Sequence, residues 1–575
     1  MAMIGIDLGT TNSLAAVWRK GRAELIPNSF GEYLTPSVVS IGQDGEIHVG
    51  RTAREMLITN PGNTFAEFKR NMGTDYRYHC KWGQTYSAED LSSFVLRRLK
   101  EDAEAYLGEE VTEAVISVPA YFNDDKRCAT KNAGKLAGLK VERLINEPSA
   151  VALKHHMGVE EAETFIIFDF GGGTLDVSLV EAFDNMVEIQ AVAGDNYLGG
   201  MDFNGLIAEN FYMEHKIPVT SLTTEEQAIV FREAEALKRD LTRQNQAERK
   251  IRLSSGEYTM CMTNQHLIHI GAELFKRMSK PIRQVINDSG LETEEIDRLI
   301  LVGGSSRMPI VSRYLDSLVD ILVVTDEQPD ESIALGAGIA AAIKERTGDV
   351  KDMILADICP FSLGTELYDG SFSPIIHRND TLPCSKTESY VTVKDNQTTM
   401  EFPIYQGDNL IARENLLLGT MEVTNLPKAP KGAVWANVTF LYDINGILDI
   451  RITSRSQTVH RVMMNKRAGL SEDELNRRLE ELRQMTLSPM EDEKNLYLME
   501  KAQRLYRECS PALRGYLSSQ LMAFRRILET GGDREIREAY VRFSLYLEAV
   551  ERSGFDFEAF DDSFFEDDME EKDLS

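Results

Sequence analysis

The chain has 575 residues, enough for two to four domains that each bury a hydrophobic core. Its formal net charge of −29 argues against nucleic acid and against an anionic membrane as main partners. Hydrophobic residues make up 42% of the chain and charged residues 27%, which is ordinary for a soluble globular protein, and no run approaches the length of a membrane span.

The N-terminus and the cysteines together favour a cytoplasmic location. The opening stretch lacks a basic region and carries Asp7 inside its apolar run, so it does not resemble a signal peptide. The six cysteines form no CxxC pair and show no disulfide-like rhythm, which predicts reduced thiols.

The first predicted element is a strand that ends in a glycine turn, "IDLGTTNS" at 6–13, and a second copy follows as "FDFGGGTLDVS" at 168–178. Aligned on their first aspartates, Asp7 and Asp169, each copy follows one apolar run and precedes another. We therefore expect two β-hairpins whose turns face one ligand from opposite sides. Glycine lets the backbone approach a ligand closely, and carboxylates beside an anion site suit a phosphate that carries its own metal. An ordinary glycine-rich hairpin is the alternative for either turn taken alone.

A third glycine turn, "LILVGGSSRMP" at 299–309, leaves a predicted strand and enters a helical stretch, where N–H groups can meet phosphate or ribose. Coincidence explains one such turn easily and three poorly, so the set predicts nucleotide binding. The chain contains no GxxxxGK[ST] motif and is not a P-loop protein. The GxGxxA match at 336–341 lies in a capped helical pattern without a preceding strand, which favours helix packing.

Between the second and third turns, residues 226–242 have the pattern of a charged helix. Glu235, Lys238, Arg239 and Thr242 are spaced i, i+3, i+4 and i+7 and therefore share one face. By sequence alone this is an ordinary charged face.

The C-terminal part changes pattern after the apolar segment "MILAD" at 353–357. Alternating strands with turn signals predict an antiparallel β-sandwich over 358–468. A helical stretch opens with a capping box, "SEDE" at 471–474, and runs to about residue 552. The remaining tail, 553–575, holds ten acidic residues and five phenylalanines and is expected to be disordered or loosely docked.

The glycine turns, together with "SVPAYFND" at 117–124 and "NEPSA" at 146–150, resemble the ATPase domain of the DnaK-type, seventy-kilodalton heat-shock chaperones. Within that family the short helical C-terminus looks most similar to the HscC-type bacterial members. The resemblance implies an actin-like α/β ATPase domain of two lobes (1–352), a linker (353–357), an antiparallel β-sandwich that binds peptide (358–468), a short helical lid (469–552) and an acidic tail (553–575).

The same resemblance implies an ATP-dependent chaperone that binds and releases short hydrophobic segments of unfolded or client proteins, driven by Mg-ATP hydrolysis. Two alternatives stay open. One is an actin-like kinase or filament-type ATPase with the same nucleotide fold, and the other is a nucleotide-binding scaffold without catalysis. A linker followed by a sandwich and a lid is expected of the chaperone alone.

For the nucleotide site, the resemblance implies that Asp7 and Asp169 hold Mg²⁺ mostly through its water shell. Lys69 would position the attacking water and stabilise charge on the γ-phosphate, while Glu147 and Asp176 would order that water and take part in proton transfer. Asp169 and Thr174 are implied to be catalytic residues as well. The remaining ATP- and ADP-contacting residues implied are Gly9, Thr10, Thr11, Asn12, Gly171, Gly172, Gly173, Glu235, Lys238, Arg239, Thr242, Gly303, Gly304, Ser305, Arg307 and Asp330. Among them Arg239 and Arg307 would stack on the base.

For the sandwich, the resemblance implies a peptide channel lined by Thr365, Tyr390, Met400 and Phe402, with Tyr368 and Val393 forming an arch over it. The alternative is that Met400 and Phe402 belong simply to the hydrophobic core.

The expected partners are extended client peptides and a J-domain co-chaperone, which in the family docks on the face marked by Arg143. Two departures from the family pattern stand out. The stretch 243–271 is shorter than the family's exchange-factor loop, which weakens the expectation of dependence on that kind of factor. Ala356 stands in the linker where the family usually has leucine, which predicts weaker linker docking.

Overall fold

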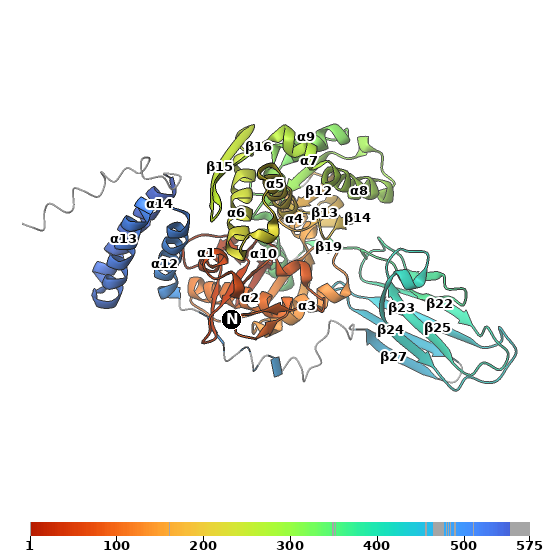
Figure 1. Ribbon diagram of the computed structural model, residues 1–575. Coiled ribbons are helices and arrows are strands. Elements are labelled where there is room, and N and C mark those ends of the chain that lie inside the picture. The colour runs from red at the N-terminus through yellow and green to blue at the C-terminus, as the bar shows by residue number, and fades with distance from the viewer. Residues whose placement is uncertain are drawn as a thin grey trace, which may run out of the picture.

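The computed structural model places two α/β lobes at the centre of the molecule, a β-sandwich on one side and three long helices on the other (Figure 1). The structure describes residues 2–159, 161–347, 350, 352–454, 457–463, 477–478, 480, 482, 485–487, 490–509 and 511–552. The predicted capping box at 471–474 and the acidic tail at 553–575 lie outside these residues. Among the helices described, none is both long and apolar enough to cross a membrane.

The first lobe, residues 2–146, is built on a sheet with the strand order β11-β10-β1-β2-β3. These strands are β1 (Ala2–Asp7), β2 (Asn12–Arg19), β3 (Arg22–Ile26), β10 (Val111–Val118) and β11 (Lys140–Asn146), and β4 (Thr35–Pro36) pairs with β2. β1 runs antiparallel to β2 and parallel to β10, so the first glycine turn closes a hairpin next to a parallel strand. The apolar runs on either side of the turn are buried, which explains why they form central strands.

The second lobe, residues 163–325, repeats this arrangement in a sheet with the order β18-β17-β12-β13-β14, to which β19 of the later linker segment adds at the β14 edge. The strands are β12 (Glu163–Phe170), β13 (Leu175–Phe183), β14 (Met186–Asp195), β17 (Arg298–Val302), β18 (Val323–Thr325) and β19 (Ile354–Ala356). The second glycine turn closes the β12–β13 hairpin, and Asp169 pairs with Asp176 across it. The sequence repeat is therefore a structural repeat.

Helices and smaller sheets complete the two lobes around these central strands. The first lobe adds α1 (Arg51–Thr59), α2 (Ala88–Leu107), α3 (Asp124–Leu136), β5 (Val38–Ile41), β6 (Glu46–Val49) and β7 (Thr64–Ala66). The second adds α5 (Gly200–His215), α6 (Thr224–Asp240), β15 (Gln246–Leu253), β16 (Gly256–Thr263), α7 (Asn264–Ile270), α8 (Ala272–Ser289), η5 (Gly304–Arg307) and α9 (Pro309–Leu318).

Helices α4 (Glu147–His156) and α10 (Ser332–Lys344) pack against each other. Gly336 of the GxGxxA match serves this packing, because a Cβ there would lie 1.8 Å from the Ala150 carbonyl oxygen, while Gly338 packs α10 against β2, where a Cβ would lie 3.2 Å from the Ala16 Cβ. The helix-packing prediction is confirmed. The predicted side-chain cap is not found, since Glu331 occupies the N-cap position of α10 without a capping hydrogen bond.

The apolar segment after the ATPase domain joins the second lobe as an edge strand. β19 pairs in parallel with β14, with Ile354 opposite Met186. Leu355 packs against the core of this region, while Ile354 stays 58% exposed. The linker is thus part of the sheet from which the Asp169 hairpin projects.

The sandwich consists of two four-stranded antiparallel sheets, as the alternating pattern predicts. One has the order β21-β20-β23-β24 and the other β22-β25-β26-β27. The strands are β20 (Leu363–Glu366), β21 (Phe372–Ile376), β22 (Cys384–Val391), β23 (Met400–Gln406), β24 (Leu416–Val423), β25 (Trp435–Tyr442), β26 (Leu448–Ser454) and β27 (Thr458–Met463). Their alternate residues form one buried core.

The C-terminal helices α12 (Met490–Glu508), α13 (Pro511–Thr530) and α14 (Asp533–Arg552) share a core of their own. They lie on the side of the ATPase domain opposite to the sandwich (Figure 1). α12 packs on α1, and β28 (Thr486–Leu487), just before it, pairs in parallel with β6. The Arg51 guanidinium lies 4.3 Å from the centre of the Tyr497 ring, so the contact combines apolar and cation–π attraction.

Candidate functional site

A cavity of about 2040 Å³ lies between the two lobes and receives residues from both hairpin turns. It brings together predicted nucleotide-site residues that are up to 323 positions apart in the chain, from Asp7 to Asp330. The predicted nucleotide-site residues that line it are Asp7, Gly9, Thr10, Thr11, Asn12, Lys69, Glu147, Asp169, Gly171, Gly172, Thr174, Glu235, Lys238, Arg239, Thr242, Gly303, Gly304, Ser305, Arg307 and Asp330. The structure therefore gathers almost the whole predicted set around one cavity.

The two glycine turns meet face to face across this cavity. A Cβ on Gly172 would lie 2.0 Å from the Thr11 hydroxyl oxygen, and one on Gly173 would lie 2.7 Å from the Thr10 methyl carbon. Any side chain at either position would therefore push the two turns apart. Glycine is required here by close approach, as expected where two loops surround one ligand.

A buried ion pair lies at the base of the cavity. Lys69 Nζ donates to Glu147 Oε1 over 2.7 Å, and the two side chains are only 5% and 6% exposed. Burial by itself would lower the pKa of Lys69, but the negative charges of Glu147 and Asp7 outweigh it and raise the pKa. The lysine is therefore a permanent positive charge fixed beside the turns.

Three aspartates surround this ion pair, and each is buried. Burial, reinforced by the charge of Glu147, raises the pKa of Asp7 and of Asp176 to about 7 and that of Asp169 well above its ordinary value. Asp7 accepts a hydrogen bond from the Ser117 hydroxyl over 3.0 Å, and Asp176 accepts one from the Tyr121 N–H over 3.1 Å. So many carboxylates in one buried place favour a bound cation, because a positive charge restores their ionised forms.

Asp7 and Asp169 reach the cavity, whereas Asp176 lies behind it on the hairpin. Within the described part of the chain, no group of three or more histidine, cysteine, aspartate or glutamate side chains is placed to hold a metal ion by itself. The site accordingly fits a magnesium ion that keeps water and phosphate oxygens as ligands, the usual state of magnesium in nucleotide sites.

The other end of the cavity is formed by helix α6 and the third glycine turn. Lys238 Nζ donates to the Gly200 carbonyl over 2.7 Å, and burial lowers the pKa of Lys238 to about 8. Arg239 is 60% exposed. Arg307, 51% exposed, pairs with Asp330 over 2.8 Å. Two exposed guanidinium groups on different elements thus border one space, an arrangement suited to a flat aromatic ring.

The structure adds a group that the sequence reasoning missed. Arg70 donates from Nε to the Gly173 carbonyl over 3.2 Å and pairs with Asp202 over 2.7 Å, which ties the first lobe to the second glycine turn. Beside this turn, the N–H of Gly200 donates to the Gly171 carbonyl over 3.0 Å. For Gly200 a signal was available, the glycine pair at the start of a helix in "LGGMDF", which resembles the glycine turn at 299–309, whereas no local pattern marks Arg70.

The six residues predicted for the peptide channel lie in the first strands and loops of the sandwich. Tyr390 stacks edge-on against Phe402 with ring centres 5.6 Å apart, and its hydroxyl lies 3.1 Å from that of Ser373. Met400 and Phe402 are buried members of the sandwich core.

The remaining three channel residues differ in environment. Thr365 is buried, and its hydroxyl donates to the Pro403 carbonyl over 2.9 Å. Tyr368 is 77% exposed, and Val393 lies in the loop that follows β22. The structure thus places both predicted arch residues in loops, with Tyr368 exposed and Val393 half-buried, and the others inside the sandwich.

The sandwich and the linker contact the ATPase domain through polar groups. Asp124 Oδ1 accepts hydrogen bonds from the Tyr442 hydroxyl over 2.9 Å and from Gln406 Nε2 over 3.1 Å. Arg378 pairs with Asp288 of the second lobe over 2.7 Å. The sandwich is therefore docked on both lobes.

The linker carboxylate Asp357 accepts hydrogen bonds from Asn146 over 2.7 Å and from the Ser149 hydroxyl over 3.0 Å, both in "NEPSA". Arg143, on the adjacent strand, is near enough for its charge to interact with Asp357. The "NEPSA" segment therefore connects the base of the nucleotide cavity to the linker that leads into the sandwich, because it also contains Glu147, which lines the cavity.

A comparison with protein-family models matches residues 3–520 to the family described as "Hsp70 protein". The match begins in the first strand of the first lobe, spans both lobes and the sandwich, and ends within α13. It therefore covers nearly the whole chain, well beyond the part that forms the nucleotide cavity.

Proposed function

Because the chain belongs to the Hsp70 family, whose members are ATP-dependent chaperones, we propose that it hydrolyses ATP in the cavity between its lobes and couples the hydrolysis to the binding and release of short apolar segments of client proteins. The family match extends through the sandwich, so it supports a chaperone rather than a kinase or filament ATPase that shares only the nucleotide fold.

The observation that carries the proposal is the pair of facing glycine turns with the Lys69–Glu147 ion pair at their base. Turns of this kind surround phosphates with backbone groups. The exposed guanidinium groups of Arg239 and Arg307 would then contact the adenine at the far end. A nucleoside triphosphate carries an aromatic base at one end and phosphates at the other, which matches the two ends of the cavity and would put its terminal phosphate next to Lys69.

The chemistry assigned to this chain's residues follows from their charges. Lys69 supplies a positive charge where negative charge accumulates on the transferred phosphoryl group. Glu147 and Asp176 would order the attacking water and take part in the transfer of its proton, and the raised pKa of Asp176 suits a proton acceptor. Thr10, Thr11 and Thr174 orient the phosphates. Magnesium, held by Asp7 and Asp169 through water, would supply further positive charge when it is bound with ATP.

Coupling between the two halves requires an element with two arrangements that both ligands bias. We infer that the docked arrangement seen here, with β19 added to the second-lobe sheet and the sandwich held at Asp124, is the one that ATP favours. Peptide would favour the undocked arrangement. A J-domain partner is expected to act on the same "NEPSA" and linker region, and clients to bind in the sandwich.

The catalytic assignment is tested by Lys69→Ala. Removal of one preorganised electrostatic contact costs about 100- to 1000-fold in rate, so single-turnover hydrolysis should fall by that factor while ATP still binds. Lys276→Ala is a matched control, because Lys276 is 70% exposed on α8 and pairs only with Glu273 of its own helix among the ion pairs described. Hydrolysis by the Lys69 variant within a few-fold of the control would contradict the assignment. Stimulation of the wild-type rate by a hydrophobic peptide and by a J-domain protein tests the chaperone cycle.

A further inference from the structure

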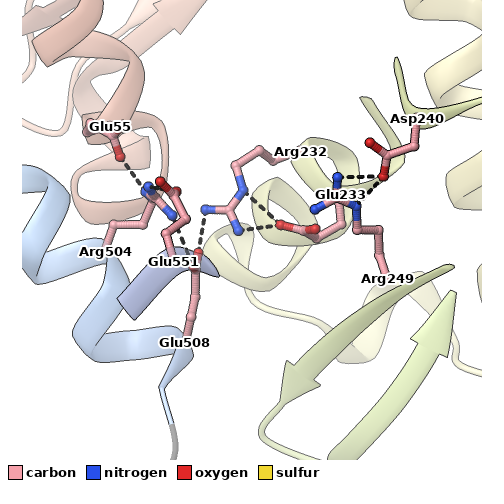
Figure 2. A network of polar contacts seen from close by, with 8 residues as sticks. All are labelled: Glu55, Arg232, Glu233, Asp240, Arg249, Arg504, Glu508 and Glu551. Atoms are coloured by element: carbon pink, nitrogen blue, oxygen red, sulfur yellow. Dashed lines mark hydrogen bonds and ion pairs between the residues drawn. The ribbon is translucent and has the colours of Figure 1, made fainter. Parts of the chain in front are cut away.

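The C-terminal helix α12 lies across the mouth of the nucleotide cavity and contacts both lobes. Tyr497 and Arg504 of α12, together with Glu551 of α14, line the same cavity as Thr11, Lys69 and the other residues of the nucleotide site. Helices from the two lobes, α1 and α6, face each other there, and Figure 2 shows the charged side chains of α12 between them.

The contact with the first lobe centres on Arg504. Its Nε binds the carboxylate of Glu55 on α1, and one of its terminal nitrogens donates to Glu551 over 2.6 Å. One turn further along α12, Arg507 donates to the carbonyl of Ile58 over 2.7 Å. That carbonyl lies in the last turn of α1, so a cation is placed where the helix end is negative.

The contact with the second lobe is made by Glu508, at the end of the same helix. It pairs with Arg232 of α6 over 2.5 Å, and Arg232 in turn binds its neighbour Glu233. Arg504 and Glu508 are joined to each other over 3.1 Å. A continuous series of alternating charges therefore runs from Glu55 in the first lobe, through α12, to Glu233 in the second (Figure 2).

The charged side chains of this series are largely buried, so their pairing depends on α12 being docked between the lobes. The side chains of Arg504 and Glu508 are 6% and 5% exposed, and those of Glu55 and Arg232 are 14% and 25% exposed. Burial would raise the pKa of Glu551, yet the charges of Arg504 and Lys501 outweigh it and hold that pKa at about 2. A partner lost from such a set leaves a desolvated charge behind, which is much more costly than breaking an exposed pair.

The same two lobe helices also meet directly. Arg54 of α1 binds Glu235 of α6 over 3.0 Å, and Glu235 is one of the residues expected at the adenosine end of the site. Residues of both helices line the cavity, so separation of α1 from α6 would widen the exit for a bound nucleotide. The α12 series adds a second bridge, supplied by another part of the chain, to the same pair of helices.

We propose that helix α12 is a clamp on nucleotide exchange: its Arg504–Glu508 pair bridges α1 and α6, so the docked C-terminal helices hold the lobes closed over the nucleotide and undocking frees it. The proposal rests on the proposed nucleotide-binding function. It assigns the C-terminal helices an action on the nucleotide site, in addition to any action on the sandwich.

The test measures dissociation of a fluorescent, non-hydrolysable ATP analogue from the full chain, chased with excess unlabelled ATP in a stopped-flow instrument. The variants are Glu55→Gln, which removes the first-lobe anchor, Arg232→Gln, which removes the second-lobe anchor, and the double variant. We expect each single variant to release the analogue at least about 10-fold faster, because loss of one partner leaves a desolvated charge behind in the docked state. Arg249→Gln is the matched control, because it removes an arginine that pairs with Asp240 within the second lobe and not with α12 in the structure described (Figure 2).

The double variant separates a clamp from two independent local effects. A bridge is broken when either end is lost, so the double variant should release the analogue no more than about twofold faster than the faster single variant. Multiplicative acceleration, or release at the rate of the Arg249 control, would overturn the proposal. If the double variant fails to fold in a thermal melt, unchanged rates in the folded single variants overturn it as well. Failure of wild-type protein to bind the analogue at all would instead count against nucleotide binding itself.

Discussion

The polar contact between the sandwich and the first lobe allows the coupling of the two halves to be tested by removal of one oxygen atom. Tyr442→Phe deletes the hydroxyl that donates to Asp124 and leaves the ring, which is buried in the sandwich core, in place. The sandwich itself should therefore stay folded. Asp124 would keep a single side-chain donor from the sandwich, Gln406, at 3.1 Å.

The size of the effect follows from the burial of this contact. A hydrogen bond to a charged group contributes about 1.5–3 kcal/mol, and Asp124 is only 4% exposed, so solvent does little to replace the lost donor. Docking should weaken by about 10- to 150-fold, at about 1.4 kcal/mol for each factor of ten. Since the docked arrangement is the one expected to release peptide, acceleration of peptide release by ATP should decrease by a factor of at least about 10.

The assay follows dissociation of a fluorescent heptapeptide after mixing with ATP. Tyr405→Phe is the matched control, because the hydroxyl of Tyr405 donates to Glu366 within the sandwich over 3.2 Å. Nucleotide-free affinity for the peptide should be the same in both variants and in the wild type. If Tyr442→Phe and Tyr405→Phe respond to ATP equally, the Asp124 contact does not hold the domains together, and the inferred route of coupling is wrong.

Three further predictions concern the interface, the linker and the sandwich. Burial raises the pKa of Asp124 from 3.8 to about 6, against the opposing hydrogen bonds from the sandwich, so the docked state binds a proton more tightly than the undocked state. The contribution of Asp124 to the docking free energy is therefore fully present below pH 3.8 and is lost as the pH rises through about 6. Protection of the linker against protease in the presence of ATP should accordingly fall between pH 5 and pH 7.5 in the wild type. The Asp124→Asn variant should show a smaller change over the same range. Replacement of Ile354 and Leu355 by aspartate should leave nucleotide binding intact but abolish the acceleration of peptide release by ATP. If ATP accelerates release from this double variant by the wild-type factor, β19 only connects the domains and does not couple them. Met400→Phe should lower the free energy of unfolding by about 1–3 kcal/mol through overpacking and also weaken heptapeptide binding, whereas unchanged affinity would assign Met400 to the core alone.

The glycine turns that line the cavity between the lobes were predictable because their signals are local. The two glycine turns flanked by apolar runs already implied two hairpins, and the pairing of Asp169 with Asp176 across the second hairpin follows from the length of its turn. Glycine spacing limits which backbone turns are possible, and alternation of apolar residues decides which face of a strand is buried. Neither the conformation of such a turn nor the choice of the buried strand face depends on distant parts of the chain. The antiparallel sandwich was predictable for the same reason.

Other features had no local signal. Arg70 looks like any surface arginine until the fold brings it to Asp202, 132 residues away, and Asp124 looks like an ordinary helix-start carboxylate until Tyr442, 318 residues away, donates to it. The resemblance predicted a helical lid, yet nothing in the sequence indicated that α12 would lie on α1, on the side opposite to the sandwich.

The sequence by itself determined where the glycine turns, the strands and the charged helices lie, because backbone freedom and the periodicity of apolar residues act over a few neighbouring positions. Only the tertiary structure decided which charges are buried and paired. Arg504 and Glu508 have the i, i+4 spacing of a common solvated helix face. Their partners Glu55 and Arg232 lie 449 and 276 residues away, and the strength of an ion pair depends on distance and desolvation, which exist only once the chain has folded.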